Sequence, residues 1–377
     1  MDGMGFFVIV VWVCVTMVLF FLLPALFVIY IAGCNFKKST VVVLDVAAKP
    51  FENLSEYNFF GGVMNELKPN ARVLPYDLIT PLFSDYAHKA RFIYMPEGIH
   101  ANYDTSKVLQ LPVGACLIKN FYYPLDFRVK GGKRRIMETR LLVHRNKAWD
   151  ALDYIWNDEQ TEAHLENAGD IKEVSWIHYD GAKRKTDYII PNKNQCKGCH
   201  WNNEEGLQPI GPKVRNLNRD LDYADGKENQ LVRWQKMGFL SNVPDLKTVP
   251  QLANWADSLN YTVNERARAY LEMNCGHCHN PQGPAYTSGL YLNIGNANFE
   301  NLGFCKTPVA AGKATGNHFY DIVPGNPAES IMPFRMKSED PGIRMPELGK
   351  GLVHTEGVAL IEQWIGEMKA DACGREK

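Results

Sequence analysis

The sequence has almost no net charge, because 41 Lys and Arg residues offset 42 Asp and Glu residues and leave a formal charge of −1. It also lacks a long run of charge of one sign, and its densest basic patch is only Lys133 to Arg135. Proteins that bind nucleic acids or other polyanions need a concentrated basic surface, so the sequence does not indicate such a partner. With 377 residues, the chain is long enough for two folded domains.

Residues 6–33 contain no charged residue, and this apolar run is long enough to cross a bilayer. The run ends in Ile31 to Cys34, which resembles the lipobox of bacterial lipoproteins, in which Cys34 receives the lipid. The preceding residues 1–5 lack Lys and Arg, unlike an ordinary signal peptide, so an uncleaved anchor helix stays open as an alternative. Both alternatives predict that the rest of the chain lies on the periplasmic side of a bacterial membrane.

Two segments have the form Cys-x-x-Cys-His, namely residues 196–200 and 275–279. Two intervening residues let both thiols reach the vinyl groups of one haem, and the adjacent histidine then faces the iron. The sequence therefore predicts two covalently attached c-type haems, and hence binding of iron. The predicted attachment and iron-binding residues are Cys196, Cys199 and His200 for the first haem, and Cys275, Cys278 and His279 for the second.

A structural zinc site is the main alternative for these four cysteines. The two pairs are 79 residues apart (275 − 196), whereas the cysteines of a zinc knuckle lie closer together. Zinc would also leave both trailing histidines without a role. Of the other cysteines, Cys116, Cys305 and Cys373 allow at most one disulfide, and the sequence does not decide whether Cys305 pairs with Cys373.

The C-terminal part carries two helix signals. Residues 264–274 are good helix formers that lead into the second haem motif, and Thr262 is in capping-box register with Glu265. From Thr355 onward, apolar residues recur at helical spacing up to Met368. Between these helices a Met345-Pro346 pair stands in a loop. The arrangement resembles class I cytochromes c, which implies an all-α domain and Met345 as the distal ligand of the second haem iron.

From about residue 74 to 191, short runs of alternating apolar and polar residues predict strands, most clearly at 113–123 and 139–144. The first haem motif follows this β-rich segment directly. Its distal ligand is not readable from the sequence: Met237 and His178 are candidates, and an open position on the iron is equally compatible. The order of Lys119, Trp149 and the haem motif faintly resembles β-sheet haem proteins that oxidise hydroxylamine, in which a strand lysine is linked to the haem.

Four further segments, 74–86, 154–160, 190–195 and 345–349, together resemble a family of uncharacterised bacterial di-haem c-type cytochromes over roughly residues 55 to 370. The resemblance implies two haems and export. Members of this family are often encoded beside a parallel β-helix repeat protein, which suggests a partner.

The expected fold class is α+β, with a β-rich N-terminal domain that ends in a haem-binding segment and an all-α cytochrome c-like C-terminal domain. The expected parts are a signal or anchor at 1–34, a linker at 35–72, the β-rich domain at 73–245 and the second haem domain at 246–377.

The leading functional hypothesis is an exported, membrane-attached cytochrome that transfers electrons between a periplasmic redox protein and the respiratory chain. One alternative is a haem enzyme, peroxidase-like or hydroxylamine-oxidising, with catalysis at the first haem and electron exit through the second. Another is a non-catalytic recognition module in the β-rich half. The sequence does not decide whether the protein is an enzyme.

Overall fold

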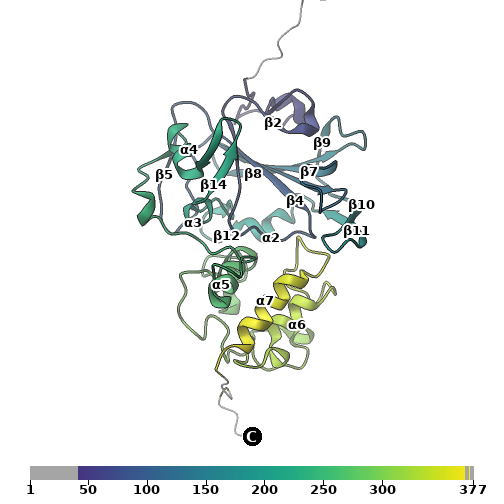
Figure 1. Ribbon diagram of the computed structural model, residues 1–377, viewed down its shortest axis with the longest axis vertical. Coiled ribbons are helices and arrows are strands. Elements are labelled where there is room, and N and C mark those ends of the chain that lie inside the picture. Colours follow the sequence, from purple (N-terminus) through teal and green to yellow (C-terminus); the bar gives the residue numbers. More distant parts are fainter. Residues whose placement is uncertain (1–40, 370–372, 374–377) are drawn as a thin grey trace, which may run out of the picture. The chain divides into compact units, whose positions relative to one another are not determined.

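The computed structural model describes residues 41–369 and Cys373. The predicted membrane segment 6–33 and the predicted lipidation site Cys34 lie outside the described residues. Within residues 41–369, no helix is both long and apolar enough to span a bilayer. We refer to residues 41–245 as the sheet part and to residues 246–369 as the helical part (Figure 1).

A six-stranded antiparallel sheet forms the centre of the sheet part (Figure 1). Its strands follow the order β3-β4-β6-β7-β8-β9, so that each strand pairs with the next one along the chain apart from the short β5. The strands are β3 (Val73–Tyr76), β4 (His88–Tyr94), β6 (Cys116–Pro124), β7 (Arg134–His144), β8 (Trp149–Trp156) and β9 (Ala163–Glu166). The strands expected at 113–123 and 139–144 correspond to β6 and β7.

Shorter elements surround this sheet. The other strands of the sheet part are β1 (Phe60–Gly61), β2 (Lys68–Pro69), β5 (Ala101–Asn102), β10 (Asp170–Ile177), β11 (Lys183–Ile190), β12 (Trp201–Asn202), β13 (Gly206–Leu207), β14 (Asp220–Tyr223), β15 (Gly226–Asn229) and β16 (Leu240–Ser241). Its helices are α2 (Cys196–His200), α3 (Val214–Leu217) and α4 (Gln230–Lys236), with the 3-10 turns η1 (Leu54–Tyr57) and η2 (Met64–Glu66).

The two faces of the sheet bury different cores because successive strand residues point to opposite sides. On one face, Ile118, Leu141 and Tyr154 pack against the segment that contains η1 and η2, including the fully buried Leu54 and Phe59. This segment belongs to the expected linker 35–72, and that expectation is wrong for its second half, because these side chains are part of the core.

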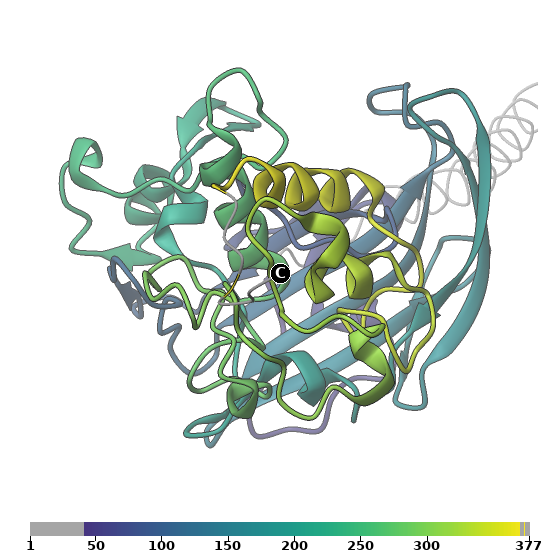
Figure 2. The same cartoon turned by 90° about the horizontal axis from the view of Figure 1, so that it is seen from below.

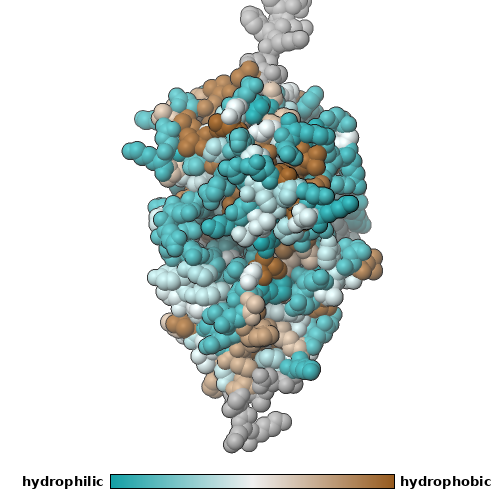
Figure 3. Space-filling view, turned by 90° about the vertical axis from the view of Figure 1, so that its left-hand side faces the viewer, coloured by the Kyte–Doolittle hydropathy of each residue, from teal (hydrophilic) through white to brown (hydrophobic). Residues whose placement is uncertain are grey.

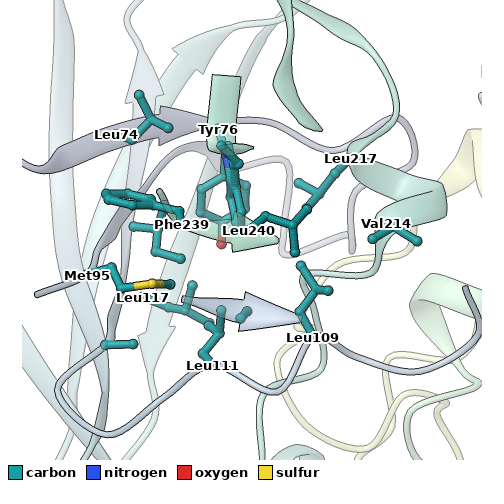
Figure 4. Packing of buried hydrophobic residues seen from close by; sticks show 14 of the residues in the cluster. Leu74, Tyr76, Met95, Leu109, Leu111, Leu117, Val214, Leu217, Phe239 and Leu240 are labelled. Carbon is teal, nitrogen blue, oxygen red and sulfur yellow. The ribbon is translucent and has the colours of Figure 1, made fainter. Parts of the chain in front are cut away.

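The opposite face of the sheet is divided along the strands. At one end, Leu117 and Leu142 pack with Trp234 of α4 and Leu217 of α3 in the cluster shown in Figure 4. At the other end, the β10–β11 hairpin packs Trp176 and its neighbours against Phe121 and Tyr123 of β6. Charged side chains lie in the middle of this face, between the two apolar groups.

The helical part contains α5 (Val263–Asn274), α6 (Ile331–Lys337) and α7 (Thr355–Gly366), together with the 3-10 turns η3 (Leu246–Thr248) at its start, η4 (Tyr286–Ser288), η5 (Gly312–Thr315) and η6 (Pro327–Glu329). Helix α5 begins at the predicted capping box of Thr262 and Glu265. The sequence favours Thr355 as the N-cap residue of α7, but the N-cap residue is His354 and Thr355 is the first residue of the helix. In the view from below, α6 and α7 lie in front of the sheet (Figure 2).

The expectation of an α+β chain with an all-α, class I cytochrome c-like C-terminal domain is wrong. The described residues are mostly strands and loops, and the longest of their six α-helices has 12 residues. The two helix signals were read correctly, but the segment between them is rich in Gly, Pro and Asn, which disfavour helix. It forms loops and 3-10 turns that hold only the short α6.

Hydrogen bonds join the two parts. The buried carboxylate of Asp85 accepts hydrogen bonds from the backbone N–H groups of Gly351 (2.8 Å) and Leu352 (2.8 Å). On the same side, the backbone N–H of Phe83 donates to the side-chain oxygen of Asn274 at the end of α5 (2.8 Å). Residues from Val41 onward accordingly form one compact unit. On the face in Figure 3, hydrophilic residues predominate and hydrophobic ones form small, separate groups.

A disulfide joins Cys305 to Cys373, 68 residues further along the chain. Closing a loop of this length lowers the entropy of the unfolded chain and stabilises the fold by about 4 kcal/mol in the chain-entropy description. We therefore expect the double variant Cys305→Ser/Cys373→Ser to lose roughly 2–4 kcal/mol of unfolding free energy, measured by denaturant titration. The control variant Cys116→Ser replaces a buried free thiol and leaves the disulfide intact. Reducing agent should destabilise that variant and the wild type, but leave the stability of the double variant unchanged.

His354 makes the stability of the fold depend on pH. Its ring stacks on Phe83 (4.1 Å between centroids), its Nδ1 lies 3.0 Å from the Tyr270 hydroxyl, and burial lowers its pKa from 6.5 to about 4. Between these values the unfolded chain takes up a proton that the folded ring does not, so the free energy of unfolding falls as pH falls, by at most roughly 3 kcal/mol. The Phe variant His354→Phe should show a shallower fall over this range in denaturant titrations. An equal slope in both proteins would contradict this assignment.

Candidate functional site

The first Cys-x-x-Cys-His motif forms the short helix α2, which lies between the sheet part and the helical part (Figure 1). His200 Nδ1 lies 2.9 Å from the backbone carbonyl oxygen of Gln208. Only a protonated Nδ1 can donate to a carbonyl, so Nε2 keeps its lone pair. Burial lowers the pKa of His200 from 6.5 to about 4, so the ring is neutral at pH 7. A neutral imidazole with a free Nε2 is the form that binds a metal.

The second motif follows α5 without a break, because the helix ends at Asn274 and its C-cap residue is Cys275. His279 Nδ1 lies 3.4 Å from the hydroxyl oxygen of Ser288. Burial lowers the pKa of His279 to about 4 as well. Both trailing histidines are therefore neutral rings whose Nδ1 faces a protein oxygen.

Both motifs line one cavity of about 610 Å³. They also contact each other directly: the Cys278 thiol lies 3.5 Å from the backbone carbonyl oxygen of Gly198. Just beyond the motifs, the backbone N–H of Asn203 donates to the carbonyl oxygen of Gln282 (3.0 Å). The fold thus brings together two motifs that are 79 residues apart in the sequence (275 − 196).

His277, which stands between the two cysteines of the second motif, lies within this contact. One ligand atom each from Cys199, His277 and Cys278 fall within 4.8 Å of one another. A hydrogen bond with Cys278 and another with His277 lower the pKa of the Cys199 thiol to about 4, and the same hydrogen bond raises the pKa of Cys278. The three side chains could bind a metal ion, but only while both sulfurs are free thiols, so a metal here and thioether bonds to haem exclude each other.

The predicted distal ligand Met345 also lines the cavity. Its backbone N–H donates to the carbonyl oxygen of Arg335 (3.1 Å), and its own carbonyl oxygen accepts from the Lys350 amine (3.1 Å). Two other methionines, Met332 and Met336 of α6, also line the cavity, but they pack in or against the core cluster that includes residues of α5 and α7. Met345 belongs to none of the described core clusters. Its thioether is therefore not needed for core packing.

The two candidates for the distal ligand of the first haem iron lie outside the cavity of the motifs. Met237 ends α4 and packs on the core cluster of Figure 4. His178 is buried among aromatic rings and accepts a hydrogen bond from the Trp176 indole N–H (3.2 Å). Neither lines the cavity of the two motifs. The structure thus places neither predicted residue beside His200.

The residues present fit covalently attached haem. The four thiols of the two motifs are free and lie beside a mostly apolar cavity, and two neutral imidazoles are oriented by protein oxygens. Gly198 allows the close approach of the Met345 loop, because a Cβ atom at Gly198 would lie 2.3 Å from Leu348 Cδ1. A larger residue at this position would require the Leu348 side chain to move.

Sequence reasoning missed a group of charged side chains on the cavity wall, namely Arg91, Arg140 and Asp153 around Lys119. The sequence carried only part of the signal: Asp153 interrupts an apolar face of β8, but Lys89 shares the face of Arg91 and Glu138 shares the face of Arg140. Their proximity depends on the pairing of strands that are distant in sequence, which the alternation pattern does not give.

Comparisons with known proteins give no relative: no protein-family model, no curated protein and no solved structure matches this chain.

Proposed function

We propose that this protein is a di-haem c-type cytochrome that transfers electrons between an exported redox protein and the respiratory chain, attached to a membrane by its N-terminal segment. The observation that carries the proposal is the meeting of both Cys-x-x-Cys-His motifs in one cavity. Each haem, once attached, supplies an iron that exchanges one electron. Haems attached to motifs in direct contact share one cavity, so electrons can pass between them.

The residues of the chain have distinct roles in this proposal. Cys196 and Cys199 would hold the first haem and Cys275 and Cys278 the second. His200 and His279 would bind the two irons through Nε2, and the hydrogen bond from His200 Nδ1 to Gln208 would fix its ring. Met345 would fill the remaining position at the second haem.

The test is the haem content of the protein produced in a host that matures c-type cytochromes. We expect two covalent haems per chain, measured by the pyridine haemochrome assay and intact mass, and no bound zinc by elemental analysis. Zinc bound without haem would overturn the proposal in favour of a thiolate metal site at Cys199, His277 and Cys278. Reduction of both haems by a single electron donor, followed optically, would support their electron exchange.

A further inference from the structure

Four adjacent strands each place one charged residue in a single row across the sheet. The register pairs Arg91 of β4 with Lys119 of β6, Lys119 with Arg140 of β7, and Arg140 with Asp153 of β8. All four residues line the cavity of the haem motifs. The row lies between the two apolar clusters of this face, since Leu117 packs at one end of β6 and Phe121 at the other.

The arginines of this row already have carboxylate partners. Arg91 forms an ion pair with Asp77 (2.9 Å). Arg140 binds both oxygens of the fully buried Glu138 (2.5 and 2.8 Å). Arg140 also lies 3.5 Å from the Asp153 carboxylate, whose pKa is raised well above its usual value by burial and by the nearby Glu138 carboxylate.

Lys119 is the cation of the row that has no carboxylate partner among residues 41–369. Its ammonium group lies over the Phe121 ring, 4.7 Å from the centroid, and forms no ion pair or hydrogen bond with the described residues. Burial, together with Arg91 and Arg140, lowers its pKa to about 7. Both arginines of the row thus lie within ion-pair distance of a carboxylate, whereas Lys119 does not among residues 41–369. A half-buried charge at an apolar wall is costly unless it is paired.

We propose that Lys119, with Arg140 beside it, forms a binding site for one carboxylate or small oxyanion in the cavity next to the first haem motif. This inference rests on the proposed function, because an attached haem lies in the same cavity. The anion has two possible sources: a free small anion that enters the cavity, or a propionate carboxylate of the attached haem.

The test uses the haem-loaded protein with Lys119→Met, Lys119→Arg and the control Lys227→Met. Lys227 is exposed on the β14–β15 hairpin, so its replacement removes the same charge away from the cavity. Formate is titrated calorimetrically into the reduced proteins at about pH 6, below the pKa of Lys119 of about 7. For a free-anion site we expect Lys119→Met to weaken formate binding at least about tenfold, whereas Lys119→Arg and Lys227→Met retain it.

If formate does not bind the wild type, resonance Raman spectra test whether the anion is a propionate of the attached haem. A shift of a haem propionate band in Lys119→Met, but not in Lys227→Met, assigns the site to the attached haem. The inference is overturned if neither formate affinity nor any propionate band depends on Lys119. Haem content is measured on the same samples. A chain without covalent haem contradicts the proposed function, whereas a di-haem chain without a Lys119 effect contradicts this inference alone.

Discussion

Replacing Cys275 and Cys278 by alanine is expected to reduce the haem content from two per chain to one, and replacing Cys196 and Cys199 should do the same. Each pair supplies the thiols of one attachment site, and no other pair of described cysteines has this spacing. The measurement is the pyridine haemochrome ratio together with the intact mass, which should fall by the mass of one haem in each double variant. The quadruple variant should carry none.

The control for this experiment is Cys116→Ala. Cys116 is a free thiol that is fully buried on the opposite face of the sheet, and burial raises its pKa, so it is an unreactive core residue. Its variant should keep two haems. Retention of both haems in either double variant would contradict the assignment of the motifs, and loss of haem from Cys116→Ala would show that haem loss only reports a damaged fold.

The motifs were readable from the sequence because their chemistry depends on local spacing. Two thiols and a histidine in five residues carry the signal wherever the fold places them. The capping box at Thr262 was equally local, and α5 begins there. In these cases the decisive contacts lie within one turn of backbone, so no knowledge of the distant chain was needed.

The shared cavity was not predictable in the same way. It depends on contacts between residues far apart in the sequence. Examples are the contact of Cys278 with Gly198 and the hydrogen bond from Gly351 to Asp85. The proximity of His277 to Cys199 was unpredictable for the same reason, because the two residues belong to different motifs. A domain division drawn at residue 245 hides such contacts, because it treats the two motifs as separate sites.

The alternation of residues along a strand does not predict the charged row, because it does not say which strands are neighbours. Alternation along β6 predicts that Leu117, Lys119 and Phe121 share a face, but it does not say that Arg91 and Arg140 flank Lys119. That information lies in the strand register, and a shift by one residue would turn each of these side chains to the other face.

The Met345 loop is held in place by groups that do not include its thioether. The backbone N–H of Met345 donates to the carbonyl oxygen of Arg335, and the Lys350 side-chain ammonium donates to the carbonyl oxygen of Met345. In addition, Leu348 contacts Gly198 of the first motif. Replacing the thioether by an alkyl group should therefore leave the loop where it is. This makes Met345→Leu a test of ligation with little effect on folding.

Met345→Leu is expected to open the iron of the second haem. Carbon monoxide should then bind the reduced variant and shift its spectrum, and the midpoint potential of that haem should fall by on the order of 0.2 V, since thioether ligation raises the potential and axial ligands tune it over roughly 0.8 V. The matched control is Met332→Leu, because Met332 lines the same cavity but packs against the core. Spectra and redox titrations of both variants decide the question. If carbon monoxide binds Met332→Leu and not Met345→Leu, the ligand is Met332, and if both variants resist it, neither thioether binds the iron.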